Sequence, residues 1–230
     1  AYIIAAVLIL ILNYKAIPGA VVEIVQSAFG MRAVAGGALG AMMLAMQKGI
    51  ARGIFSNEAG IGSAPIAAAA VQTTEPVRQG LVSMLGTVID TIIICTMTGL
   101  SIVITGSWDK GLEGVAVTTR AFQVGLPFPA KVSAFILMLC LVFFAFTTIL
   151  GWDYYSERCL DYLTGNNQKV VRAYRWIYIA CVFIGPYMTV SAVWTIADIV
   201  NGLMAIPNLI ALLALNGVVV AETKKYFKKF

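Results

Sequence analysis

The chain has 230 residues, of which 60% are hydrophobic and 12% are charged, and its formal net charge is +5. Charged residues make up about a quarter of ordinary soluble domains, so this composition excludes a soluble globular protein and indicates a polytopic α-helical membrane protein. The sequence contains no histidine, the commonest proton shuttle, and no GxSxG, HExxH or P-loop motif, which argues against an enzyme.

The first elements are the end of a helix and an interfacial segment. Residues 1–14 begin with the apolar run AYIIAAVLILIL and have no initiator Met, so we expect the end of a membrane-spanning helix in a chain that starts partway through a longer protein. Asn13 and Pro18 are expected to stop this helix. Residues 21–29 carry Glu23 among apolar side chains, which is typical of an amphipathic helix at the membrane surface.

Residues 33–72 contain two apolar segments that flank the polar, glycine-rich stretch FSNEAG at 55–60. An interrupted membrane helix leaves peptide groups without helical partners, and lipid tolerates such backbone only where it lines a cavity or binds a ligand. The sequence therefore predicts a broken helix with a binding site at the break. The alternative is that SNEAG is a cytoplasmic turn after a helix that ends at Gln47.

Further membrane spans are expected after the break. They cover residues 80–105, 130–162, 174–193 with an interruption at Gly185 and Pro186, and 196–221. A polar segment separates the first two of these spans and is expected to hold a short helix over residues 115–124. Together with residues 1–14 and the broken helix, the pattern predicts about six transmembrane elements.

The basic residues lie at the ends of the apolar spans, where lipid headgroups and topology explain them better than nucleic acid does. Counting loop lysines and arginines assigns nine to one face, and the positive-inside rule places that face in the cytoplasm. The nine are Arg78, Arg158, Lys169, Arg172, Arg175, Lys224, Lys225, Lys228 and Lys229. We therefore expect a multi-pass protein of the cell membrane with a cytoplasmic C-terminus.

The segment RGIFSNEAGIGSAPIAAAA at 52–70 closely resembles the signature of the sodium:alanine (amino acid:cation) symporters. Three more segments extend the resemblance over nearly the whole chain: PVRQGLVSMLGTVIDTIIICTMTGL, FFAFTTILGWDYYSERCLDYL and ADIVNGLMAIPNLIALLALNGVVV. The resemblance implies an all-α membrane fold of the LeuT type, in which two inverted five-helix repeats hold substrate between their broken first helices. On this comparison residues 1–14 end helix five, residues 15–230 form the second repeat, and the N-terminal repeat of the same protein is missing.

The resemblance also implies a function. We expect sodium-coupled symport of a small neutral amino acid, alanine or glycine, into the cell, with sodium as the coupling ion and no other cofactor. A channel or a non-transporting membrane binding protein is the alternative from another class. A channel needs a continuous polar pore, and the spans are too apolar to supply one.

The resemblance places the substrate against Phe55, Ser56 and Asn57, where peptide carbonyl and N–H groups at the break can hold the ammonium and the carboxylate of an amino acid. Trp152 lies four residues after Thr148 and shares its helix face. We expect these two residues to close the substrate pocket and to leave room only for small side chains. The alternative for Trp152 is an interfacial aromatic residue.

The resemblance further implies a sodium site on the predicted helix over residues 130–162. Thr147 and Thr148 match a pair of hydroxyl ligands in the LeuT type, and the backbone carbonyl of Phe144 is a further candidate. Sodium prefers hard oxygen ligands, which threonine hydroxyls and carbonyls provide. The alternative is that both hydroxyls bond to the preceding turn of their own helix.

Other polar residues within the predicted spans leave more than one interpretation open. Glu58 is expected to pair with Arg52 or Lys48, to be protonated, or to hold the break open, so both a structural role and ion coupling remain possible. Asp90 is a candidate ion or proton site, with hydrogen bonding to a neighbouring helix as the favoured alternative. Asn208 follows a proline and is expected to pack helices or act as a gate.

Overall fold

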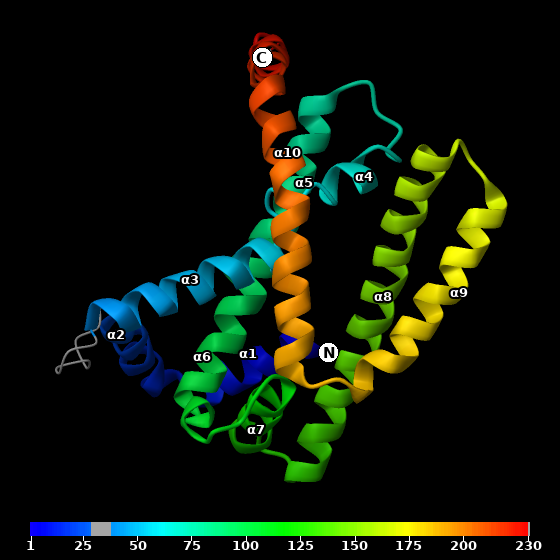
Figure 1. Ribbon diagram of the computed structural model, residues 1–230. Coiled ribbons are helices and arrows are strands. Elements are labelled where there is room, and N and C mark those ends of the chain that lie inside the picture. Colours follow the sequence, from blue (N-terminus) through cyan, green and yellow to red (C-terminus); the bar gives the residue numbers. More distant parts are fainter. Residues whose placement is uncertain (29–37, 230) are drawn as a thin grey trace. The chain divides into compact units, whose positions relative to one another are not determined.

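The computed structural model describes residues 1–28 and 38–229, and within these ranges the chain consists of helices and connecting turns without a β-strand (Figure 1). This confirms the all-α class predicted from the sequence. The chain divides into two compact units: Ala1–Gly53 with Val88–Phe144, and Ile54–Thr87 with Ala145–Phe230. Each unit is described separately below.

The helices have the following bounds. They are α1 (Tyr2–Leu12), α2 (Ile17–Ala28), α3 (Ala38–Ser56), α4 (Ala64–Ala68), α5 (Pro76–Thr87), the π-helix η2 (Val88–Cys95), α6 (Thr96–Ile104), α7 (Val115–Gly125), α8 (Ala130–Thr164), α9 (Gln168–Ile184) and α10 (Val190–Phe227). Three short 3₁₀ turns are η1 (Tyr14–Ala16), η3 (Ser107–Asp109) and η4 (Gly185–Tyr187). Helix α7 confirms the short helix expected over residues 115–124.

Three helical segments in the described part of the chain are long and apolar enough to cross a membrane: Pro76–Ile104, Ala130–Thr164 and Val190–Phe227. A fourth span results if α1 and the bent continuation Tyr14–Ala28, which are inclined by 75° to each other, count as one. The sequence-based expectation of about six elements is therefore higher than the three or four observed here. The first observed span contains Asp90 in its π-helical part.

The predicted span over residues 174–193, with its expected interruption at Gly185 and Pro186, corresponds to parts of two helices in the structure. Helix α9 has 17 residues, about 26 Å, and ends at Ile184. A 3₁₀ turn with Pro186 follows, and Thr189 caps α10 by accepting a hydrogen bond from the Ala192 N–H at 3.3 Å. Proline has no N–H to donate and its ring obstructs the preceding turn, so the α-helix stops near it and the last predicted residues belong to α10.

The first unit has an apolar cluster in which α1 packs against α6 and α7. The rings of Tyr2 and Phe122 stack with centroids 5.4 Å apart, and Ile9 and Leu137 are fully buried beside them. A Cβ atom on Gly125 would lie 2.8 Å from Cγ2 of Ile9, so the close approach of α7 to α1 requires glycine at this position. Aromatic and branched side chains thus hold this unit together.

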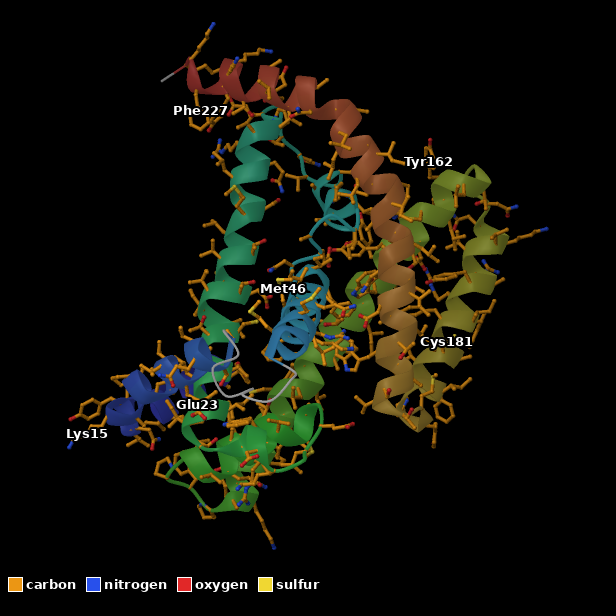
Figure 2. All side chains as sticks on the ribbon, turned by 60° about the vertical axis from the view of Figure 1, so that its left-hand side comes forward. Lys15, Glu23, Met46, Tyr162, Cys181 and Phe227 are labelled. Carbon is orange, nitrogen blue, oxygen red and sulfur yellow. The ribbon has the colours of Figure 1, made fainter. Side chains whose placement is uncertain are left out.

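In the second unit, the part of α8 after residue 145 and α9 lie side by side as an antiparallel pair (Figure 1). The guanidinium of Arg175 donates to Glu157 with Nε to Oε1 at 2.7 Å, and the Tyr178 hydroxyl donates to the Ile149 carbonyl at 2.9 Å. Tyr162, at the end of α8 next to the turn, is 88% exposed (Figure 2). These polar contacts fix α9 against α8 along the helices.

Candidate functional site

Helix α3 ends at Ser56 with a pair of hydrogen bonds that define a Schellman motif. The Ala59 N–H donates to the Ile54 carbonyl at 3.0 Å, and the Glu58 N–H donates to the Phe55 carbonyl at 3.4 Å. This motif requires a left-handed residue directly after the helix, and glycine usually supplies it. The chain therefore leaves the helix at the place where the sequence predicts a break, nine residues beyond the end assumed in the cytoplasmic-turn alternative.

The residue in the left-handed position is not a glycine. Glu58 has φ of 51°, and Gly60 and Gly62 follow with φ of 75° and 88°. A left-handed conformation costs a residue with a side chain about 1–2 kcal/mol, whereas glycine adopts it freely. The two glycines explain how the chain turns twice more, while the glutamate carries a conformational cost that glycine would avoid.

Two buried residues follow the left-handed glutamate. Ile61 is 2% exposed and Ser63 is fully buried. The Ser63 hydroxyl donates to Oε2 of Glu58 at 2.7 Å, and this hydrogen bond joins the two ends of the non-helical stretch. Ser63 also stands at the N-cap of α4, yet its side chain makes no cap bond to the described residues of that helix.

The second half of the broken helix is shorter than predicted. Residues 33–37 of the predicted element lie outside the described residues, and α4 ends at Ala68 instead of continuing to Gln72. An isolated helix of a few residues is marginal because nucleation costs more than one turn of hydrogen bonds returns. The interrupted element therefore consists of the long helix α3, seven non-helical residues that form the break, and the short helix α4.

Helix α10 forms one wall of the break within the second unit. The rings of Phe55 and Trp194 meet edge to face with centroids 5.3 Å apart. A Cβ on Gly62 would lie 3.2 Å from Cβ, Cγ and Oδ1 of Asn208, and one on Gly60 would lie 3.7 Å from Leu209. The tryptophan contact was not predicted, because no motif marks Trp194 and only its position beside the break shows its role.

Helix α8 carries Tyr155, whose hydroxyl interacts electrostatically with Glu58. The ring of Tyr155 in turn meets the ring of Trp152 edge to face with centroids 5.7 Å apart. Through Tyr155, the structure thus connects the break to the part of α8 that carries the predicted substrate residue Trp152.

The predicted sodium ligands lie together on one helix. Phe144, Thr147 and Thr148 are exposed residues of α8, and the ring of Phe144 meets the ring of Tyr2 edge to face with centroids 5.6 Å apart. Two neighbouring hydroxyls on a helix surface have the chemistry of hard oxygen ligands. Their assignment to sodium stays a prediction.

A cavity of about 630 Å³ lies between α4 and the end of α8, beside the break. It is mainly apolar, and its lining residues are Pro65, Ile66, Ala69, Ala70, Tyr154, Arg158, Cys159, Tyr162 and Leu163. The Arg158 guanidinium lies over the ring of Tyr154 and pairs with Asp161 at 3.3 Å. The predicted substrate residues are not among those that line this cavity.

Comparison with known proteins identifies related transporters. Residues 1–230 match the model of the sodium:alanine symporter family. An uncharacterized transporter of Haemophilus influenzae is 54% identical over 230 residues, which are 99% of this chain and 50% of that protein. The sodium/alanine symporter AgcS of Methanococcus maripaludis is 46% identical over 229 residues, 98% of this chain and 49% of that protein.

A third relative differs in the substrate that its name states. The probable sodium/glutamine symporter GlnT of Bacillus subtilis is 39% identical over 229 residues, which are 99% of this chain and 46% of that protein. The chain thus spans about half the length of the curated relatives it matches.

Proposed function

Because this chain belongs to the sodium:alanine symporter family, a family of transporters and not of enzymes, we propose that it forms part of a secondary transporter for a small neutral amino acid. Alanine or glycine enters the cell together with sodium, which is the coupling ion. The names of the relatives support this proposal, since one is a sodium/alanine symporter and another a probable sodium/glutamine symporter. The apolar helices support a multi-pass protein of the cell membrane.

The observation that carries the proposal is the interruption between Ser56 and Ala64. The C-terminal end of the 19-residue helix α3 has a partial negative charge, which attracts the ammonium group of an amino acid. We place the substrate ammonium at this end of α3, beside Phe55, Ser56 and Asn57, as the resemblance to the family implies.

The remaining substrate contacts come from apolar and hydroxyl groups. Phe55 supplies a ring that is backed by Trp194. We place Trp152 and Thr148 of α8 on the opposite side of the substrate. Large rings on both sides leave a small volume for the substrate side chain. A pocket of this kind selects alanine or glycine over glutamine.

Sodium is bound by Thr147 and Thr148 with the carbonyl of Phe144. Binding of sodium and substrate to the same conformation raises the affinity for each by the same factor. The other half of the site belongs to the N-terminal repeat of a LeuT-type fold, and the chain covers about half of its relatives, which supports this assignment. The C-terminus faces the cytoplasm on the basis of the lysines around it.

The experiment uses the full-length transporter that carries this chain, reconstituted in liposomes. We expect labelled alanine to accumulate with an inward sodium gradient and not with a potassium gradient, and we expect glycine to compete better than glutamine. Equal accumulation with both cations contradicts sodium coupling. Stronger competition by glutamine contradicts the small pocket.

The sodium site has its own test. We expect Thr148→Ala to raise the half-saturating sodium concentration by roughly tenfold, which corresponds to a loss of about 1.4 kcal/mol of binding free energy. The matched control is Thr119→Ala in α7, whose hydroxyl donates to the Val115 carbonyl at 2.9 Å. Equal sodium activation curves for the two variants would end the assignment of Thr148.

A further inference from the structure

Glu58 occupies a backbone position that favours glycine. Its φ of 51° lies in the left-handed region, at the residue that closes the Schellman motif of α3. Glycine at this position would satisfy both turn hydrogen bonds without strain. A residue held in an unfavourable conformation requires compensation from its surroundings, and such residues concentrate at functional sites.

The compensation comes from Ser63. This residue is fully buried, and its hydroxyl donates to the Glu58 carboxylate at 2.7 Å across five residues of the chain. A serine at an N-cap ordinarily accepts a hydrogen bond from the first turn of its helix. Here the hydroxyl serves the glutamate, so the contact stabilises the loop in preference to the short helix.

Helix α10 contacts the loop at two places within the second unit. Asn208 of α10 lies so close to Gly62 that a Cβ there would approach it to 3.2 Å, and the ring of Trp194 holds Phe55. The Glu58–Ser63 hydrogen bond ties the two ends of this loop together.

We propose that Glu58 and Ser63 form a clamp that sets the conformation of the break and thereby positions the peptide groups of residues 55–57 for the substrate. Glu58 is a positioning residue and does not bind the substrate itself. This inference rests on the proposed function, because the substrate is the one assigned above. It goes beyond that function by giving Glu58 a positioning role, which its left-handed backbone and its hydrogen bond to Ser63 support.

The clamp predicts an order among variants at two positions of the full-length transporter. Glu58→Gly keeps the left-handed backbone and removes the carboxylate, Ser63→Ala removes the donor, and Glu58→Gln keeps an acceptor oxygen without the charge. We expect the first two to raise the KM for alanine about tenfold with kcat nearly unchanged, and Glu58→Gln to stay within about threefold of wild type. The double variant is expected to be no worse than either single variant.

The matched control is Ser101→Ala. Ser101 is as fully buried as Ser63, but its hydroxyl donates to the Met97 carbonyl of its own helix at 2.8 Å. We expect its KM to equal that of wild type. A wild-type KM for Glu58→Gly overturns the clamp, as does a Glu58→Gln variant as impaired as Glu58→Gly, which would mean that the charge itself binds a cation.

A second measurement separates this inference from the proposed function. If the wild-type protein transports no alanine with sodium, the proposed function fails, and the positioning role fails with it. If the wild-type protein transports alanine, thermal unfolding in detergent tests the clamp independently of KM. The proteins compared are wild type, Glu58→Gly, Ser63→Ala and the double variant. Additive shifts in Tm for Glu58→Gly and Ser63→Ala would show that the two side chains do not act together and would overturn the clamp.

Discussion

Two connections between helices in the second unit begin with the same hydrogen bond and then differ. After α8, the Asn166 N–H donates to the Asp161 carbonyl at 2.8 Å, as the Ala59 N–H does to Ile54 after α3. In the first connection Gly165 has φ of 62° and Asn166 after it has φ of 66°, whereas in the second connection the left-handed residue that closes the turn is Glu58 with φ of 51°. Glycine and asparagine adopt the left-handed conformation more readily than glutamate does, so the same turn is built once with favoured residues and once with an unfavoured one.

The N-cap residues of the two following helices, α9 and α4, also differ in the hydrogen bonds that their side chains make. Asn167 caps α9, since its Oδ1 accepts a hydrogen bond from the Lys169 N–H at 3.1 Å. Ser63 precedes α4 but donates its hydroxyl to Glu58. The α8–α9 turn therefore has the residues expected for stability alone, whereas the break has residues that hold a particular loop conformation at a cost in stability.

The largest effect is expected for Gly62→Ala. Its φ of 88° strains any residue with a side chain, and the new methyl group would approach Asn208 to 3.2 Å. We expect a loss of about 2–3 kcal/mol of stability, seen as a lower Tm in detergent, together with strongly reduced alanine uptake. Gly202→Ala in α10 is the control, because no described atom lies within 4 Å of its Cβ position. A Tm equal to wild type for Gly62→Ala would mean that the loop is not held against α10.

Gly165→Ala is expected to have the next largest effect, and only on stability. The φ of 62° is unfavourable for alanine, but no described atom lies within 4 Å of the added methyl group. The expected cost is about 1–2 kcal/mol, measured as a lower Tm, while the KM for alanine stays at the wild-type value. A change in KM as large as that of Glu58→Gly would remove the distinction between the two connections.

Asn167→Ala is expected to cost about 1 kcal/mol, because it removes the hydrogen bond that caps α9. Thermal unfolding measures this loss, and Thr189→Ala provides a comparable case at the start of α10. Both variants should keep the wild-type KM for alanine. An unchanged Tm for Asn167→Ala would show that this cap contributes nothing and that the two connections do not differ in this respect.

The sequence predicted the helix class, the end of a helix near Ser56 and the short helix α7, because hydrophobic runs, glycines and prolines act locally. It did not predict the length of α4, since the alanines at 67–70 favour helix in isolation and only the surrounding structure decides where a short helix ends. The contacts of Trp194 with Phe55 and of Asn208 with Gly62 join residues more than a hundred positions apart. Tertiary packing determines such pairs, and no local pattern encodes them.

The smallest effect is expected for Glu75→Gln. The Lys229 ammonium donates to Oε1 of Glu75 at 2.9 Å, and this hydrogen bond first, with the positive charge second, lowers the pKa of Glu75 from 4.5. A lowered carboxyl pKa contributes stability that is present above the unfolded-state value and is lost as the pH falls through the folded-state value. Solvent and salt screen this exposed pair, so Glu75→Gln should change Tm slightly at about pH 7 and not at all in strong acid.

The Glu75–Lys229 pair offers a second explanation of what determines the conformation of the break. Glu75 lies at the far end of the segment that follows α4, and Lys229 belongs to the C-terminal tail. Glu113→Gln is the control for the loss of an exposed carboxylate. If Glu75→Gln lowered Tm and raised the KM for alanine as much as Ser63→Ala does, the tail and not the Glu58–Ser63 hydrogen bond would determine the conformation of the break.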